Sequence, residues 1–224
     1  MSRASDRAYA IIRDMILAGE LLSGAKIGEE ALAEQCGVSR TPIREALSRL
    51  EAELLIRRSD TQRSFVADWS LDDVEEMFEL RGLLESRAAR RAAKRINWSQ
   101  IERLKMHHEA IGHAIYAATP DTHRFIEHNH LFHGVILEAS ASAQLTTMLA
   151  RIVERPIVHR TAQNYSFDDL KRSHRQHGEL LAAFEHRDPV WAEAVMVSHI
   201  RRAFHAYASA HTGQRITDVS QAAE

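Results

Sequence analysis

The sequence of 224 residues contains one cysteine, four prolines and nine glycines, and aromatic residues make up 6% of it. A single cysteine, Cys36, cannot form a disulfide within the chain, so we expect it to be a small buried apolar group. So few prolines and glycines are not typical of a β-rich or disordered chain. There is no signal-peptide pattern and no run of about 18 apolar residues, which a membrane span requires. We therefore expect a cytoplasmic protein with no membrane segment.

A strong net charge is also missing, because 29 lysines and arginines nearly balance 31 aspartates and glutamates. The net charge of −2 excludes a uniformly basic nucleic-acid-binding protein, so any positive field must be local. Histidine, in contrast, is abundant. All fourteen histidines lie at or after His107. This asymmetry predicts that the two halves of the chain do different chemistry.

Residues 32–56 read as a helix, a tight turn and a second helix. Gly37 supplies the turn, where a residue without Cβ strain is favoured. Ser39 is a good N-cap for the second helix, and Pro42 is tolerated in its first turn. The sequence therefore predicts a helix-turn-helix.

The second of these helices has two different faces. Its apolar residues recur at i, i+3, i+4 and i+7, namely Ile43, Ala46, Leu47 and Leu50. Another face carries guanidinium forks and hydroxyls, from Arg40, Thr41, Arg44 and Ser48, with Ser39 at the helix start. Such a face has the chemistry that reads base edges in a DNA major groove. The alternative is an ordinary amphipathic surface helix.

The flanking segments complete a winged helix-turn-helix. A first helix runs to about Glu20, and a second covers about Glu29 to Cys36. Residues 56–58 and 64–67 predict two short strands joined by a polar turn, which would form the wing. The candidate phosphate contacts on this wing are Arg57, Arg58 and Arg63. The alternative for these arginines is plain solvation.

From Ser70 onward the chain predicts helices with short loops. The expected bounds are 71–94, 97–117, 120–140, 142–159 with a kink near Pro156, 168–187 and 188–211. Six such helices predict an antiparallel bundle. The fold class is therefore mostly α, with residues 1–69 as the winged helix-turn-helix, 70–212 as the helical domain and 213–224 as a polar, frayed tail.

Three histidines lie on apolar stripes of three predicted helices: His133, His177 and His199. Asn129 precedes His133 by four residues, so both project from one helix face. Neutral imidazoles that converge with a carboxamide oxygen suit zinc, nickel or another divalent ion. The alternative is that each histidine is a satisfied core residue. His130 and His174, about a turn from these residues, are substitute ligands or solvated.

Arg81 lies on the inward stripe of the helix expected at 71–94. A buried arginine needs an anionic partner. That partner is either Glu85, four residues on, or the carboxylate of a bound effector.

These motifs also resemble a known family. The segment VSRTPIREAL is very similar to the recognition-helix signature of GntR-type bacterial regulators. The segments NHLFH, HGELLAAFEHRD and VSHI resemble the metal-binding motifs of the FadR-type ligand-binding domain, called FCD. The resemblance implies a divalent metal held by Asn129, His133, His177 and His199, and an organic-acid effector. The chain departs from the pattern at Glu30, where relatives carry a basic residue, and at Leu54, where they carry glycine.

Together these observations predict a DNA-binding transcription regulator, most simply a repressor. It would bind a palindromic operator as a homodimer, because one recognition helix reads only about 4–5 base pairs. The cofactor would be zinc, with nickel or manganese as alternatives, and Arg81 would contact a small carboxylate. Two other functions stay open at this point: a metalloenzyme on a His-rich bundle, and a metal sensor without an organic effector. The sequence identifies neither the effector nor the operator.

Overall fold

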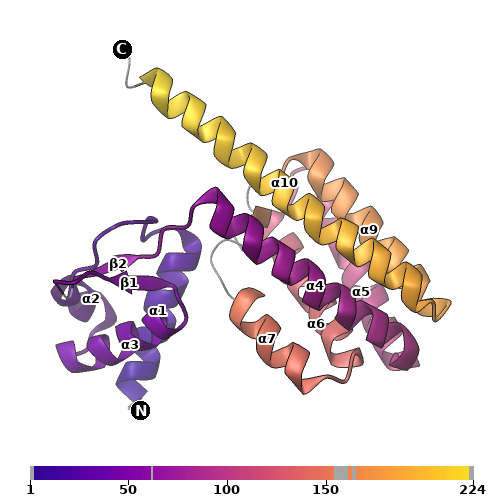
Figure 1. Cartoon of the computed structure of the whole chain (residues 1–224), viewed down its shortest axis with the longest axis horizontal. Coiled ribbons are helices and arrows are strands. Elements are labelled where there is room, and N and C mark those ends of the chain that lie inside the picture. The colour runs from indigo at the N-terminus through magenta and orange to yellow at the C-terminus, as the bar shows by residue number, and fades with distance from the viewer. Residues whose placement is uncertain (1–2, 62, 154–160, 163–164, 222–224) are drawn as a thin grey trace. The chain divides into compact units, whose positions relative to one another are not determined.

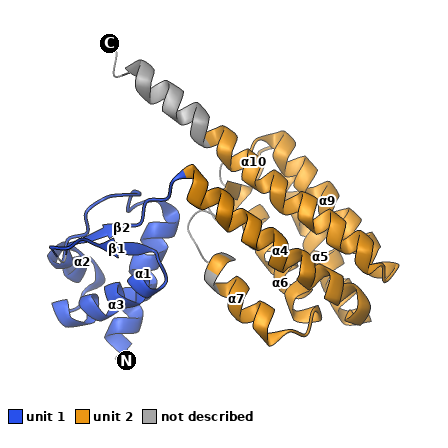
Figure 2. Cartoon of the chain, viewed as in Figure 1, with its two compact units in different colours: residues 1–70 blue, residues 71–224 orange. Residues whose placement is uncertain are grey.

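The computed structural model describes residues 3–61, 63–153, 161–162 and 165–221. The chain divides into two compact units, Met1–Ser70 and Leu71–Glu224, which are described separately below (Figure 2). Among the described residues, unit 1 contains three helices and two strands, and the regular elements of unit 2 are all helices.

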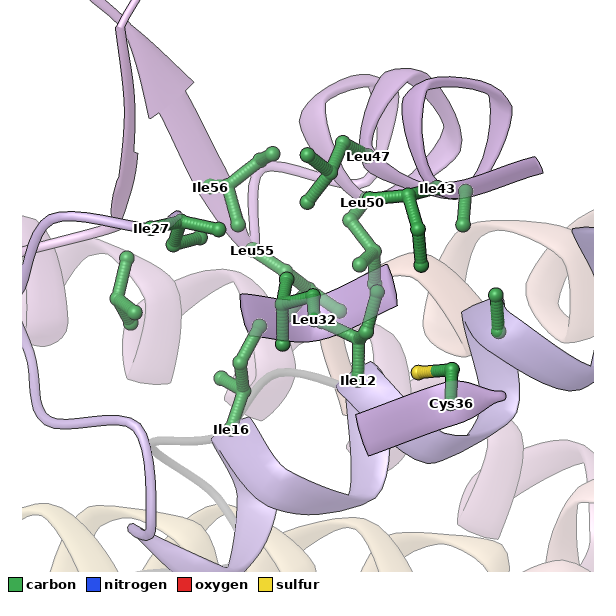
Figure 3. Close-up of a cluster of buried hydrophobic side chains, with 13 residues drawn as sticks. Ile12, Ile16, Ile27, Leu32, Cys36, Ile43, Leu47, Leu50, Leu55 and Ile56 are labelled. Atoms are coloured by element: carbon green, nitrogen blue, oxygen red, sulfur yellow. The ribbon is translucent and has the colours of Figure 1, made fainter. Parts of the chain in front are cut away.

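Unit 1 is built around a core of side chains from all of its elements. Its elements are α1 (Arg3–Ala18), α2 (Glu29–Cys36), α3 (Arg40–Ala52), β1 (Ile56–Arg58) and β2 (Ser64–Val66) (Figure 1). Figure 3 shows the side chains that meet between the three helices: Ile12, Ile16, Leu32, Cys36, Ile43, Leu47 and Leu50. Cys36 is fully buried, as the sequence predicted. The predicted inward stripe of α3 is therefore confirmed.

The turn between α2 and α3 depends on a left-handed backbone. Gly37 has a φ of 63°, and its N–H donates to carbonyls of the last turn of α2. Glycine adopts this conformation without Cβ strain. Ser39 stands at the N-cap of α3, as predicted, but its hydroxyl accepts no capping hydrogen bond from the described residues. The Ser39 side chain is instead exposed at the start of α3.

The wing is short. β1 and β2 are antiparallel, with Ile56 opposite Val66 and Arg58 opposite Ser64. The other edge of β2 bonds to the segment before α2, where the Ile27 N–H donates to the Ser64 carbonyl over 2.8 Å. Leu54 precedes β1 with a φ of 60°. This explains why a glycine is expected there, since a left-handed non-glycine residue costs about 1–2 kcal/mol.

Unit 2 is a bundle of antiparallel helices, as predicted. Its six helices among the described residues are α4 (Leu71–Arg95), α5 (Trp98–Ile115), α6 (Thr122–Ala139), α7 (Ala143–Val153), α9 (Phe167–Glu185) and α10 (Pro189–Gln221). The helix α10 packs along α4, and α5 packs against α6 and α9 (Figure 1). Capping boxes begin two helices, Asn97 with Gln100 for α5 and Ser166 with Asp169 for α9. These polar pairs satisfy backbone donors at both starts.

One expected helix end differs from the structure, and one expected kink is not tested by it. The last helix was expected to end near His211, but α10 continues to Gln221. No proline occurs between residues 212 and 221, so nothing in that segment removes a helical hydrogen bond outright. The kink expected near Pro156 lies outside the described residues. Among the described helices, none combines the length and apolarity needed to cross a bilayer.

Candidate nucleic-acid interface and metal centre

Helix α3 separates its apolar and polar residues as the sequence predicted. Ile43, Ala46, Leu47 and Leu50 have no exposed surface. The polar side chains on the outer side of the helix are exposed, namely Ser39, Arg40, Thr41, Arg44 and Ser48. Burial of one stripe thus fixes the orientation of the helix and leaves two guanidinium forks directed to solvent.

Both arginines of this face form ion pairs with the start of α2. Arg40 donates from Nη1 to Glu30 Oε1 over 3.0 Å, and its Nη2 lies 3.6 Å from Glu29 Oε2. Arg44 donates from Nε to Glu29 Oε2 over 2.8 Å. The two arginine side chains stay 53% and 61% exposed, so they remain accessible while their charge is compensated. The sequence indicated that Glu30 is unusual but did not predict these pairs.

The three arginines predicted as phosphate contacts differ in their surroundings. The Arg57 guanidinium lies over the Phe65 ring at 4.8 Å, and its side chain is exposed. Arg58 Nε lies 3.2 Å from Glu51 Oε2 on α3. Arg63 is exposed at the end of the wing turn. Arg57 and Arg63 are therefore the more accessible of the three, and their contact with DNA stays a prediction.

In unit 2 the structure brings the three predicted histidines together. His133 from α6, His177 from α9 and His199 from α10 each offer a ring nitrogen, and these atoms all lie within 4.8 Å of one another. The ring centroids are 5.5 Å apart for His133 and His177, and 4.9 Å apart for His177 and His199. Residues far apart in the sequence thus converge from three helices of one bundle.

Burial keeps two of these imidazoles neutral. Loss of solvent holds the pKa of His177 well below its usual value, and the neighbouring His199 and His133 lower it further. Burial likewise lowers the pKa of His199 to about 3. Neither Nδ1 nor Nε2 of His177 has a hydrogen-bond partner among the described residues. Buried polar atoms without partners are costly, and a ligand at this position would relieve that cost.

Glu85 on α4 orients the third histidine. Its Oε2 lies 2.7 Å from His133 Nδ1, and its Oε1 accepts from Arg81 Nε over 2.9 Å. Burial alone would raise the pKa of the Glu85 carboxyl, but Arg81 and His133 lower it more strongly, so the carboxylate is ionised. An ionised carboxylate accepts the Nδ1 proton of His133, which leaves a lone pair on Nε2. The sequence marked Glu85 only as a partner of Arg81.

The remaining predicted residues of this site are placed as follows. Arg81 is buried and forms the ion pair with Glu85, one of its two expected partners, while an effector contact stays a prediction. Asn129 is half-buried one turn before His133, and its role as the fourth ligand also stays a prediction. His130 is exposed. His174 stacks on His108 with ring centroids 4.1 Å apart and is not part of the triad.

The donor set suits a divalent transition metal. Three imidazoles in reach of one point are ligands that zinc accepts, and an open fourth position is typical of sites that bind a further ligand. A carboxylate that fixes the tautomer of one ligating histidine is a common support of such sites. The triad can therefore hold a metal ion, and its geometry does not distinguish zinc from nickel or manganese.

Comparison with known families identifies both units of the chain. The family described as bacterial regulatory proteins, gntR family, matches residues 4–66. The family described as FCD domain matches residues 76–202, which cover more than half of the chain. The first range contains the helix-turn-helix and its wing, and the second contains the histidine triad.

Individual proteins show the same similarity. The chain is 30% identical to the uncharacterized HTH-type transcriptional regulator YdhC of Bacillus subtilis (strain 168). The alignment covers 144 residues, or 64% of each of the two chains. It is 27% identical to the HTH-type transcriptional repressor RspR of Escherichia coli (strain K12), over 88% of this chain and 86% of that one. Among solved structures, E. coli McbR/YncC superposes with a TM-score of 0.78 at 22% identity, covering 94% and 100% of the two chains. That likeness shows a shared fold.

Proposed function

Since the chain belongs to the gntR family of bacterial regulatory proteins and contains an FCD domain, we propose that it is a repressor whose operator affinity is controlled by a small carboxylate bound at a metal in unit 2. Membership of this family indicates a DNA-binding transcription regulator and not an enzyme. The observation that carries the proposal is the convergence of three imidazole nitrogens within 4.8 Å, with both nitrogens of His177 unpartnered among the described residues.

In unit 1 the residues of α3 would read the operator. Arg40 and Arg44 are long, planar donors suited to guanine O6 and N7, while Ser39 and Thr41 can bond bases or phosphates. Arg57, Arg58 and Arg63 would contact the backbone and set the register. Because one helix reads only a few base pairs, a homodimer on a palindromic site supplies the missing specificity.

In unit 2 the ligands would be His133, His177 and His199, with Asn129 as the fourth. A bound divalent ion supplies positive charge in a buried site, where a carboxylate is held far more strongly than in water. Arg81 lies beside this site, and although its charge is paired with Glu85, it would donate to an organic acid through N–H groups that Glu85 does not use. Zinc is the first choice for three imidazoles, with nickel and manganese as alternatives.

Control of DNA binding requires that the acid prefer one of two states. His133, His177 and His199 come from three helices, and Arg81 comes from α4, which follows the wing after residues 67–70. An acid that contacts Arg81 and the triad site would bias the position of α4 against the other helices. A coupling of about 1–3 kcal/mol is typical and would lower operator affinity about 5–150-fold. The names of RspR, a transcriptional repressor, and of a probable D-xylose utilization operon transcriptional repressor of Paenarthrobacter nicotinovorans support the choice of a repressor.

An operator titration tests the proposal. Zinc-loaded protein, chelator-treated protein and the variant Arg81→Ala are each titrated with and without candidate acids. The expected result is release of only the zinc-loaded wild type by a cognate acid. A response that survives both Arg81→Ala and metal removal would overturn the mechanism. DNA binding that depends on zinc but on no acid would indicate a metal sensor instead.

A further inference from the structure

A pocket of about 230 Å³ lies in unit 2 beside the histidine triad. Its walls come from α4, α6, α7 and α10, so it belongs to the same bundle as the metal site. His133 and Glu85 stand in its wall, which places it directly next to the ligand that Glu85 orients. Most of the remaining wall is apolar: Ala88, Ile136, Leu137, Leu149 and Met196.

The size of the pocket sets the size of what it can hold. An apolar protein cavity of roughly 150 Å³ accommodates a benzene molecule. At about 230 Å³, this pocket has room for a six-membered ring with a short side arm. A two-carbon acid such as acetate would leave most of the apolar wall without contacts, which forfeits the dispersion energy of a filled site.

The charges around the pocket allow one carboxylate in the ligand and disfavour a second. Arg81 compensates the charge of Glu85, so Glu85 does not cancel the positive charge of a divalent ion on the three imidazoles. A carboxylate at the His133 end would therefore be attracted. Besides Glu85 and His133, the polar side chains of the described wall are His130 and Thr146, which are both exposed, and the Thr146 hydroxyl already donates to the Ser142 carbonyl. A second carboxylate placed among Ile136, Leu137 and Leu149 would gain no donor from those apolar side chains, and a charge removed from water without a partner is strongly unfavourable.

We propose that the effector is a monocarboxylic acid with an apolar body about the size of a benzene ring. Its carboxylate lies at the metal end, and its body fills the pocket between α4, α6 and α7. This inference rests on the proposed function, because it assumes that an acid binds at the triad. It adds the chemical class of that acid and the residues that select it.

Gly134 offers a sharp test, because it follows His133 on α6 and lines the pocket. A Cβ added at Gly134 meets no heavy atom within 4 Å. Gly134 is exposed on the pocket wall and the position of this Cβ is open, so we expect a leucine side chain there to extend over the space assigned to the ligand. Gly134→Ala is the matched control, since it makes the same change of helix propensity and adds one methyl group. Ala150→Leu, at an exposed position of the pocket rim, is a second filling variant.

Binding of phenylacetate, acetate and malonate to zinc-loaded protein is measured by calorimetry, with zinc content determined for every variant. Phenylacetate should bind wild type at least about tenfold more tightly than acetate or malonate, because each buried methylene is worth about fourfold. Gly134→Leu should lose at least about tenfold in phenylacetate affinity and keep its acetate affinity, while Gly134→Ala keeps both within a few-fold.

Two outcomes would overturn the inference. One is malonate or acetate binding as tightly as phenylacetate. The other is phenylacetate affinity unchanged in both Gly134→Leu and Ala150→Leu. If acetate and malonate bind and release operator DNA, the proposed function stands and only the ligand class is wrong. If no acid binds zinc-loaded protein at all, the proposed function fails together with this inference.

Discussion

Replacing Glu85 by glutamine should damage both the stability of unit 2 and its affinity for metal. The Glu85 side chain is 7% exposed and accepts from two groups, Arg81 at 2.8 Å and His133 Nδ1 at 2.7 Å. Arg81 and His133 approach different oxygens of Glu85, and in glutamine one of these two positions becomes an NH₂ group that cannot accept. Either Arg81 faces an NH₂ group, or His133 must accept at Nδ1 and carry its proton on Nε2.

The magnitudes follow from these two consequences. Removing one partner of a buried ion pair typically costs 3–5 kcal/mol, because the other charge, here on Arg81, is left uncompensated. Loss of the carboxylate that orients a ligating histidine typically lowers metal affinity about 10–100-fold. Glu75→Gln is the matched control, since Glu75 pairs with Arg201 at 2.9 Å while both side chains are more than a third exposed. An exposed pair of this kind contributes about 0–1 kcal/mol.

The assay is urea unfolding of chelator-treated protein, followed by zinc titration against a competing chelator. Glu85→Gln should lower the free energy of unfolding by several kcal/mol more than Glu75→Gln, and zinc affinity should fall only in Glu85→Gln. The double variant Arg81→Gln/Glu85→Gln should recover part of the lost stability, because no unpaired charge remains. Equal stability and equal zinc affinity of the two single variants would refute the reasoning.

Three further predictions concern other parts of the molecule. Arg40→Ala should cost about 1–3 kcal/mol of binding free energy on the operator and relax the base preference. Arg57→Ala should weaken binding to all DNA sequences alike and reduce the slope of log affinity against log salt by about one. Titrations of operator and scrambled DNA distinguish the two results. His177→Ala should strongly reduce the zinc content of purified protein, and His130→Ala should not; equal content by elemental analysis would exclude this ligand set. Burial lowers the pKa of His108 from 6.5 to about 4, so the fold favours its neutral form and stability should decline as pH falls from 6.5 towards 4. Since His108 is only partly buried, its effect on stability is a fraction of that shift. His108→Gln should reduce the pH dependence of unfolding in chelator-treated protein, and the remainder comes from groups such as His177 and His199, whose pKa values burial also lowers.

The helices and the inward faces of the three histidines were predictable because they depend on local periodicity, whereas the grouping of these histidines into one site was implied by the resemblance to the FCD motifs. The apolar stripe of α3 and the positions of His133, His177 and His199 all follow from spacing along single helices. The site around them was harder to predict. The bond between Glu85 and His133 joins residues 48 apart in the sequence, and spacing along one helix carries no information about such a pair.

The same limit explains two other omissions. The ion pair of Glu29 with Arg44 depends on how closely α2 and α3 approach each other, which the turn at Gly37 sets. The apolar pocket beside His133 depends on the space left between α4, α6 and α7, and a sequence gives the volumes of side chains but not their fit. The length of α10 was missed because polar residues were taken as the sign of a helix end, although none of them is a proline.

The pairing of Arg40 and Arg44 with Glu29 and Glu30 also bears on how the regulator is distributed in a cell. Chromosomal DNA offers on the order of 10⁶–10⁹ competing sites, and phosphate attraction holds a basic protein on all of them. Acids that compensate the arginines on α3 weaken this attraction wherever the bases are wrong. At a cognate site, we expect hydrogen bonds to guanine to replace the bonds to the acids. We therefore expect fewer molecules to be sequestered on random sequence, which leaves a larger share of the protein free to find its operator.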